Sequence, residues 1–527
     1  MPRPGLVAAG LAAAGLVALV ILAALTGLGQ GGGSVDWSVL VGPYGRRVVV
    51  FSCLQAGLST LLSLALGALL ALGLARRASF PGRQFALSLI ATATALPGIV
   101  VVFAVVTVYG RGGWIGALAR SFGFDPGTWL YGLPGILIAH VFMNGPFCAR
   151  VLLQALEAVP PEQHRLAAHL GLTPRAVFRH LDLPILGREM PGLAALVFLL
   201  CFSSFAVVLT LGGGPDRATL EVAIFEALRV DADFARAAML ATGQLGFGLV
   251  LTVVFVALAR RPAEIAGAGR AATRPDRESR GLRLFDLAAL AIGALVVVPP
   301  LVAVALAARR LDTLIARDVM AAAATSAWVA LAAASLSVML AVAIAVAARD
   351  LRRHRRAGLG RLVATIAYAP LALPSFALIA GLFGVLRRVV DPLAIGPGMV
   401  VLVNALMALP FVVRLVEPPL LLAGERHGRL ADALDMRGLV RLRLVDWPLL
   451  KVPLRSAFAL AAALSLGDLG VIAFFGGPDF ETLPFLLYQR LGAYRLDEAA
   501  AVALLLALIV FLLSLAAHSE PRRDAEA

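Results

Sequence analysis

Long apolar stretches, each long enough to cross a bilayer, constrain the fold of this chain more than any other feature. A span needs roughly 18 or more mainly apolar residues, and about twelve such stretches follow one another along the 527 residues. Lipid offers the backbone no hydrogen-bonding partners, and continuous apolar runs fit helices rather than the alternating strands of a barrel. We therefore predict an all-α, polytopic membrane protein, with kinks at Pro97 and Pro374. The predicted spans are 6–28, 48–74, 86–108, 132–156, 190–211, 236–258, 285–308, 320–348, 362–386, 398–423, 454–476 and 498–517.

The distribution of basic residues indicates how these spans are oriented. Arginines crowd alternate loops, among them 76–83 and 349–361, whereas the loops between them hold fewer. Because short cytoplasmic loops are enriched in Lys and Arg, we expect both termini in the cytoplasm. The same enrichment accounts for the formal net charge of +14 without a nucleic-acid partner.

Two polar segments between the apolar stretches repeat one another. Residues 160–184 are PPEQHRLAAHLGLTPRAVFRHLDLP, and residues 424–448 are GERHGRLADALDMRGLVRLRLVDWP. We call them the first and the second island. Both are basic and amphipathic, and both lie on the predicted cytoplasmic side. Residues that coincide at a spacing of 264 are Arg165/Arg429, Leu166/Leu430, Ala167/Ala431, Leu170/Leu434, Asp182/Asp446 and Pro184/Pro448.

The repetition extends from the islands into the neighbouring spans. Pro146-Phe147 matches Pro410-Phe411, and the Gly-Gly-Pro-Asp sequence at 213–216 recurs at 476–479. Six spans per repeat is an even number, so the two halves should be parallel and related by an axis along the membrane normal. The predicted divisions are a first half at 1–259, a cytoplasmic linker at 260–283, a second half at 284–518 and a cytoplasmic tail at 519–527.

Local sequence predicts a helix, a turn and a second short helix in the first island. Residues 162–170 allow two helical turns, and Gly171 suits a helix stop. Thr173 and Pro174 suit the start of a second helix, which is expected to end before Pro184. In the second island, Asp435 occupies the place of Gly171.

Each island taken alone could be an amphipathic loop lying on membrane lipid. A lipid-bound loop does not need a counterpart, however, and these two recur at equivalent places in both halves. The duplication favours two matching docking sites for a partner outside the membrane.

The islands resemble the cytoplasmic coupling loop of bacterial ABC importer permeases. That loop has the pattern Glu-Ala-Ala, three residues, Gly, nine residues, Ile, one residue, Leu-Pro. The matching positions are Ala167, Gly171, Leu181, Leu183 and Pro184 in the first island, and Ala431, Val445 and Pro448 in the second. The departures are Arg165 and Arg429 for Glu, Leu166 and Leu430 for the first Ala, Asp435 for Gly, and Trp447 for Leu.

The resemblance implies a type I ABC importer permease in a bacterial inner membrane. It also implies two copies of a cytoplasmic ABC ATPase and an extracytoplasmic substrate-binding protein as partners. The residues implied in ATPase coupling are Arg165, Ala167, Leu170, Gly171 and Pro184, with Arg429, Ala431, Leu434, Asp435 and Pro448.

The chain cannot itself supply the phosphate-binding loop of an ATPase. Such a loop needs Gly-Lys-Ser/Thr, but the one lysine, Lys451, follows Leu450. ATP hydrolysis is therefore expected on a separate subunit, and this chain is expected to be a transport subunit rather than an enzyme, without a cofactor or a metal.

Two further stretches are similar to the thiamine-importer permeases of this family. They cover residues 202–215 and 465–476. The resemblance implies a small-molecule substrate, namely thiamine or its phosphates. Ferric-iron importer permeases share the fused two-half layout and remain an alternative.

Asp468 is the residue most relevant to the substrate. It falls inside the eleventh predicted span, where a charge costs roughly 2.5–3.5 kcal/mol on insertion. A carboxylate beside aromatic rings suits the cationic ring of thiamine, so Asp468 with Phe202, Phe205 and Phe474 forms a candidate substrate path. Asp468 could equally make a structural hydrogen bond at a helix break, and the phenylalanines could serve packing.

Two other classes of protein fit the sequence less well. A secondary transporter of twelve helices would also have two halves, but it would need ion-coupling charges within the membrane and no duplicated docking loop. A membrane enzyme would need clustered His, Asp or Glu, and the seven histidines have no ligand-like spacing.

Overall fold

The structure, a computed structural model, describes residues 4–31, 38–77, 79–125, 127–214, 217–258, 274, 276, 279–307, 316–353, 356–436 and 438–518. Most of the predicted linker and all of the predicted tail lie outside these residues. The described residues confirm the all-α fold, since they form no β-strand and only one isolated bridge, between Gly477 and Phe480.

The first sequence half combines long spans with short helices. They are α1 (Pro4–Gly31), α2 (Ser38–Val41), α3 (Pro43–Arg76), α4 (Arg83–Ala95), α5 (Gly98–Tyr109), α6 (Trp114–Ser121), α7 (Leu133–Glu157), α8 (Pro161–His169), α9 (Pro174–Val177), the π-helical turn η1 (Phe178–Asp182), α10 (Leu183–Phe202), α11 (Ala206–Leu211), α12 (Leu220–Arg229) and α13 (Phe234–Leu258).

The second half has the same plan. Its elements are α14 (Arg280–Leu306), α15 (Arg317–Arg353), α16 (Ala357–Ile366), the 3-10 turn η5 (Ala369–Ala372), α17 (Ser375–Leu386), α18 (Gly396–Ala433), α19 (Leu439–Arg441), the π-helical turn η6 (Leu442–Asp446), α20 (Trp447–Gly467), α21 (Gly470–Phe475), α22 (Leu483–Gly492) and α23 (Leu496–His518).

Within the described residues, eleven helices are long and apolar enough to cross a membrane. The ninth predicted span, 362–386, is instead divided into the shorter helices α16 and α17. Pro97 and Pro374 end helices rather than kink them, because proline disfavours the helical conformation in the residue before it. Leu96 and Leu373 are accordingly extended, with ψ of 134° and 111°.

Two further predicted spans are broken at equivalent places. The span predicted at 190–211 is α10 followed by α11, and the span predicted at 454–476 is α20 followed by α21. The breaks fall at residues 203–205 and 468–469. Irregular backbone at membrane depth is tolerated where it is buried in protein or lines a cavity. We therefore expect both breaks to lie inside the protein or beside a cavity.

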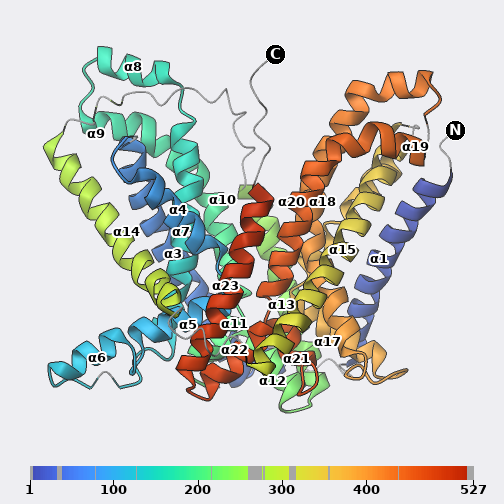
Figure 1. The fold of residues 1–527 in the computed structure, drawn as a ribbon, viewed down its shortest axis with the longest axis horizontal. Helices are drawn as coiled ribbons and strands as arrows, with labels where there is room; N and C mark the ends of the chain where they lie inside the picture. Colours follow the sequence, from blue (N-terminus) through green and yellow to red (C-terminus); the bar gives the residue numbers. More distant parts are fainter. Residues whose placement is uncertain are drawn as a thin grey trace.

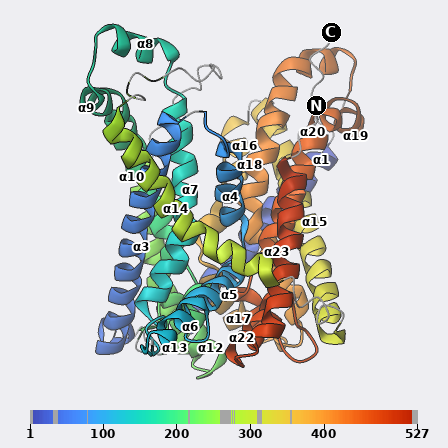
Figure 2. The same ribbon diagram turned by 60° about the vertical axis from the view of Figure 1, so that its left-hand side comes forward.

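The first helix of each half packs against the other half. Helix α1 lies on α15 and α17, while α14 lies on α3 and α5 (Figures 1 and 2). The α1–α17 contact depends on two glycines, because a Cβ at Gly27 would stand 1.8 Å from the carbonyl oxygen of Gly381. Each half thus packs against the first helix of the other half. The residue boundaries of the two halves that were assigned from the repeat stay a prediction.

Both islands lie on one face of the molecule. In Figure 1, α8 and α9 stand at the upper left and α19 at the upper right, on the same side as the start of α1 and the end of α23. Helices α6, α12 and α22 gather at the opposite face in both views (Figures 1 and 2). A partner binding to that one face can therefore contact both islands at once.

Candidate functional site

The first island has the predicted helix, turn and helix start. Helix α8 ends at His169, and Gly171 follows in the left-handed conformation with φ of +61°. The hydroxyl of Thr173 then accepts a hydrogen bond from the backbone N–H of Ala176 at 3.4 Å, which caps α9. These observations confirm the roles predicted for Gly171 and Thr173.

The predicted end of the second short helix before Pro184 is wrong. The chain passes instead through η1 into α10 without leaving the helical conformation. Proline has no N–H to donate, and its ring crowds the carbonyl four residues earlier, so a regular α-turn is disfavoured here. The wider π-turn, in which the N–H of Leu183 donates to the carbonyl of Phe178, lets the helix continue through Pro184.

The second island has the same shape with different residues. Its first helical part is the end of α18, residues 425–433, rather than a separate helix. Asp435 has φ of +50°, the same left-handed conformation as Gly171, which an aspartate tolerates better than most residues. The turn η6 begins 264 residues after η1, at Leu442 rather than Phe178. The island is therefore a structural repeat as well as a sequence repeat.

Each island exposes two leucines one helical turn apart. Leu166 and Leu170 are 58% and 65% exposed, and Leu430 and Leu434 are 60% and 58% exposed. An apolar residue of that size in solvent, repeated on a matching loop, marks a contact surface.

Some of the remaining residues implied in coupling are buried within the islands, and others are exposed to solvent. Ala167 and Ala431 pack inward, with exposures of 3% and 1%, whereas Arg165, Pro184 and Pro448 are exposed. The side chain of Arg429 lies outside the described residues.

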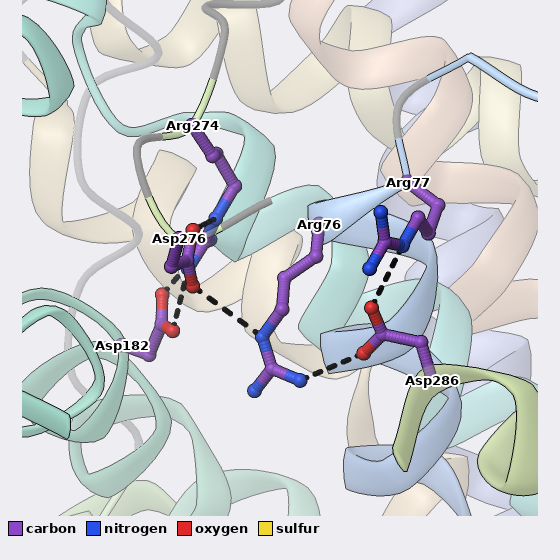
Figure 3. A network of polar contacts seen from close by, with 6 residues as sticks. All are labelled: Arg76, Arg77, Asp182, Arg274, Asp276 and Asp286. Carbon is purple, nitrogen blue, oxygen red and sulfur yellow. Dashed lines mark hydrogen bonds and ion pairs between the residues drawn. The ribbon is translucent and has the colours of Figure 1, made fainter. Parts of the chain in front are cut away.

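The first island is anchored by a buried ion pair that the sequence did not predict. Asp182, at the end of η1, accepts two hydrogen bonds from Arg274, at 3.0 and 2.7 Å (Figure 3). Arg274 also pairs with Asp276 at 3.1 Å, and all three side chains are buried. Since Arg274 and Asp276 belong to the predicted linker, this segment holds the first island to the bundle.

The same network continues into two membrane helices. Arg76, at the end of α3, lies 3.5 Å from Asp276 and 2.8 Å from Asp286 of α14 (Figure 3). Arg77 contacts the other oxygen of Asp286 at 2.9 Å. Three arginines thus meet three aspartates, so the buried charges are balanced.

The second island has a shorter anchor. Asp446, at the end of η6, pairs with Arg349 of α15 at 2.7 Å, and Arg349 also pairs with the neighbouring Asp350 at 2.9 Å. Asp446 is buried, like Asp182. The aspartate is thus the repeated element, while the arginine that meets it comes from α15 in one half and from the linker in the other.

His164 lies within the first island, and the charges of this network change its pKa. Burial lowers the pKa of His164 below its ordinary value of 6.5, and the guanidinium of Arg274 lowers it further. Asp182 and Asp276 act in the opposite direction. In the second island the equivalent position is Gly428, which cannot titrate.

A cavity of about 460 Å³ lies between the two halves. The first half contributes the end of α10 with α12 and α13, and the second contributes η5, α18 and the end of α20. Phe202 and Asp468 line it, so the structure brings together two of the predicted substrate-path residues from opposite halves.

Asp468 makes the structural hydrogen bond expected at the helix break, and its part in the substrate path stays a prediction. Its Oδ2 accepts a hydrogen bond from the N–H of Val471 at 3.1 Å, which caps α21 at the helix break. Asp468 also lines the cavity, next to the Asn404–Ser465 pair, in which the amide donates to the hydroxyl at 2.9 Å. The carboxylate therefore shapes the break and faces the cavity.

Phe205 and Phe474 are not among the residues lining the cavity. Phe205 packs against Phe376 at 4.5 Å between ring centroids, and Phe474 packs against Phe383 at 5.5 Å. Both rings are buried in the apolar core, and a part for them in the substrate path stays a prediction.

Comparison with known proteins identifies the family. Residues 63–263 match the family described as the inner membrane component of binding-protein-dependent transport systems. The thiamine transport system permease protein ThiP of Brucella melitensis is 42% identical over 517 residues, which cover 97% of this chain and 94% of that protein. The chain belongs to this permease family.

Other relatives support the same placement. ThiP of Escherichia coli is 40% identical to the permease over 529 residues, covering 99% of this chain and 98% of that protein. The putative ferric transport system permease protein FbpB 1 of Haemophilus influenzae is 29% identical over 220 residues, covering 41% of this chain and 34% of its own length. The similarity to the thiamine permeases predicted from the sequence is thus confirmed, and the permease is a multi-pass inner-membrane protein.

Sequence reasoning missed Arg274, Arg349 and Glu221. Arg274 and Arg349 stand among many other arginines, and only the fold shows which of them meet Asp182 and Asp446. Glu221 follows the repeated Thr-Leu pair and is an isolated acid between apolar residues, a signal that could have been noticed. It lines the cavity.

Proposed function

We propose that the permease forms the translocation pathway of an ATP-driven importer for thiamine or its phosphates. The observation that carries this proposal is the end-to-end similarity to curated thiamine permeases. The ferric alternative receives less support, because that similarity covers less than half of either chain.

In the proposed assembly, each island receives one copy of a cytoplasmic ABC ATPase. The support is geometric: each island has two exposed leucines, and both islands lie on one face of the molecule (Figure 1). Burial of a leucine side chain contributes about 1.5–3 kcal/mol, so each pair supplies a hydrophobic anchor. With this face in the cytoplasm, both termini are cytoplasmic, in agreement with the distribution of arginines.

ATP binding would bring the two ATPase copies together and draw the islands toward one another. The first island would transmit that motion through Asp182 to Arg274, α3 and α14, and the second through Asp446 to α15. The cavity between the halves would then open alternately to either side. An extracytoplasmic binding protein would deliver the substrate at the face opposite the islands, near α12 and α22.

The proposal is tested with the permease reconstituted in liposomes with its ATPase and binding protein. We expect ATP-dependent uptake of labelled thiamine that requires the binding protein. A matched sample given ferric iron should show no uptake. Uptake of iron without uptake of thiamine would overturn the proposed substrate.

A further inference from the structure

Glu221 is a buried acid that the fold leaves without a full set of partners. It lies in the first turn of α12, is 1% exposed and lines the cavity between the halves. Its Oε2 atom has no hydrogen-bond partner within the described part of the chain. A buried carboxylate is costly unless another group compensates it, so a ligand is the natural partner for this atom.

The position of Glu221 is fixed by the helix that carries it. The N–H of Leu220 donates to the hydroxyl of Ser52 on α3 at 3.0 Å, which secures the start of α12. Helix α12 also packs against α17 of the other half. The carboxylate is therefore held where the two halves meet.

A second carboxylate, Asp468, lines the same cavity from the other half. The pair does not follow from the repeat. At the spacing of 263 that relates Leu220 to Leu483, Glu221 corresponds to Pro484, and at the spacing of 264 Asp468 corresponds to Ser204. Each half thus contributes one acid from a position at which the other half has a neutral residue.

The rest of the cavity matches a flat organic cation. Phe202, Met407 and Phe411 provide apolar and aromatic surface, and Ser203 and Asn404 provide hydrogen-bonding groups. No arginine or lysine is among the described residues that line it. Two acids, aromatic rings and the lack of basic groups in the lining select for positive charge.

We propose that Glu221 and Asp468 together bind the cationic aromatic ring of the cargo during its passage. This inference rests on the proposed function and names the residue that selects the charge. Glu221 supplies the free carboxylate, and Asp468 adds negative charge while it caps α21.

The experiment compares Glu221→Gln with the wild-type complex in liposomes containing ATPase and binding protein. The glutamine keeps the shape and removes the charge, so thiamine uptake should fall about ten-fold. The thermal midpoint of the purified complex should stay unchanged. Glu221→Asp should recover part of the uptake. Glu226→Gln, the same change on the same helix but outside the cavity lining, should retain the wild-type uptake.

The outcomes separate this inference from the proposed function. If the wild type imports no thiamine, the proposed function fails. If the wild type imports thiamine and Glu221→Gln matches it, the inference alone is overturned. Loss of uptake together with a lowered thermal midpoint would also overturn it, because Glu221 would then have a structural role.

Discussion

The two islands share a shape but differ in what holds them. Each has a left-handed residue after its first helix, at Gly171 or Asp435, and each ends in a π-turn with a buried aspartate. The first aspartate meets Arg274 from the linker, whereas the second meets Arg349 from α15. The shape of an island therefore does not depend on which element supplies the guanidinium.

The difference in anchoring changes what each island can move. The first is tied to α3 and α14 through a chain of six charged side chains, five of them buried (Figure 3). The second is tied to α15 through Arg349. Helix α1 packs on α15, so the second island is also linked to the first helix of the chain. Changes at the two anchors should accordingly have separable effects.

Removal of the anchoring arginines should give the largest effects. Loss of one partner of a buried ion pair costs about 3–5 kcal/mol, because the remaining charge is left uncompensated. Arg274→Ala should speed amide hydrogen exchange in residues 161–182, and Arg349→Ala should do so in residues 425–446. Exchange followed by mass spectrometry on the purified permease measures both.

An exposed pair serves as the control for these variants. Arg111 and Asp125 pair at 3.1 Å on the surface, and such pairs contribute about 0–1 kcal/mol. Arg111→Ala should leave both islands unchanged. Equal acceleration in both islands by either anchor variant would show that they are not held separately.

Acid pH should loosen the first island alone. His164 has its ordinary pKa of 6.5 when unfolded and a lower one when folded, so the unfolded island binds a proton first. The contribution of neutral His164 to the stability of the island is fully present above pH 6.5 and is lost progressively as the pH falls below that value. Exchange in residues 161–182, corrected for the intrinsic rate, should rise between about pH 7.5 and about pH 5.5.

The second island is the internal control, because Gly428 occupies the place of the buried His164 and the one histidine within residues 425–446, His427, is exposed. Residues 425–446 should show no such increase, and His164→Asn should abolish it in the first island. A pH response that survives His164→Asn would assign the effect to another group.

The smallest effect should come from the turn of the first island. A Cβ at Gly171 meets open space, so Gly171→Ala costs only the left-handed backbone conformation, about 1 kcal/mol. Gly187 of α10 also has open space around it but lies in a helix, where alanine should stabilise by about 0.5–1 kcal/mol. Thermal unfolding midpoints of the two variants should shift in opposite directions, and a shared direction would contradict this account.

The sequence predicted what depends on local chemistry and composition. The spans follow from apolar length, the turns from Gly171 and Thr173, and the matching islands from the repeat. The π-turn was not predicted, because a proline such as Pro184 ordinarily indicates a helix boundary. The helix continues through Pro184 because the turn before it is wider than an α-turn.

Contacts between distant segments could not be predicted in the same way. Choosing Arg274 and Arg349 among the arginines requires the placement of α3, α14 and α15, which no local pattern encodes. The packing of α1 against the second half and the approach of Glu221 to the cavity depend likewise on how the halves assemble. Asp468 was found because a charge inside an apolar span is conspicuous.

The central claim is that the two islands are equivalent docking sites for one ATPase subunit each. Native mass spectrometry of the purified complex tests it most directly. The account predicts two ATPase subunits per permease chain, one subunit in either Leu170→Asp or Leu434→Asp, and none in the double variant. Retention of both subunits by the double variant, or a wild-type complex with a single subunit, would contradict it.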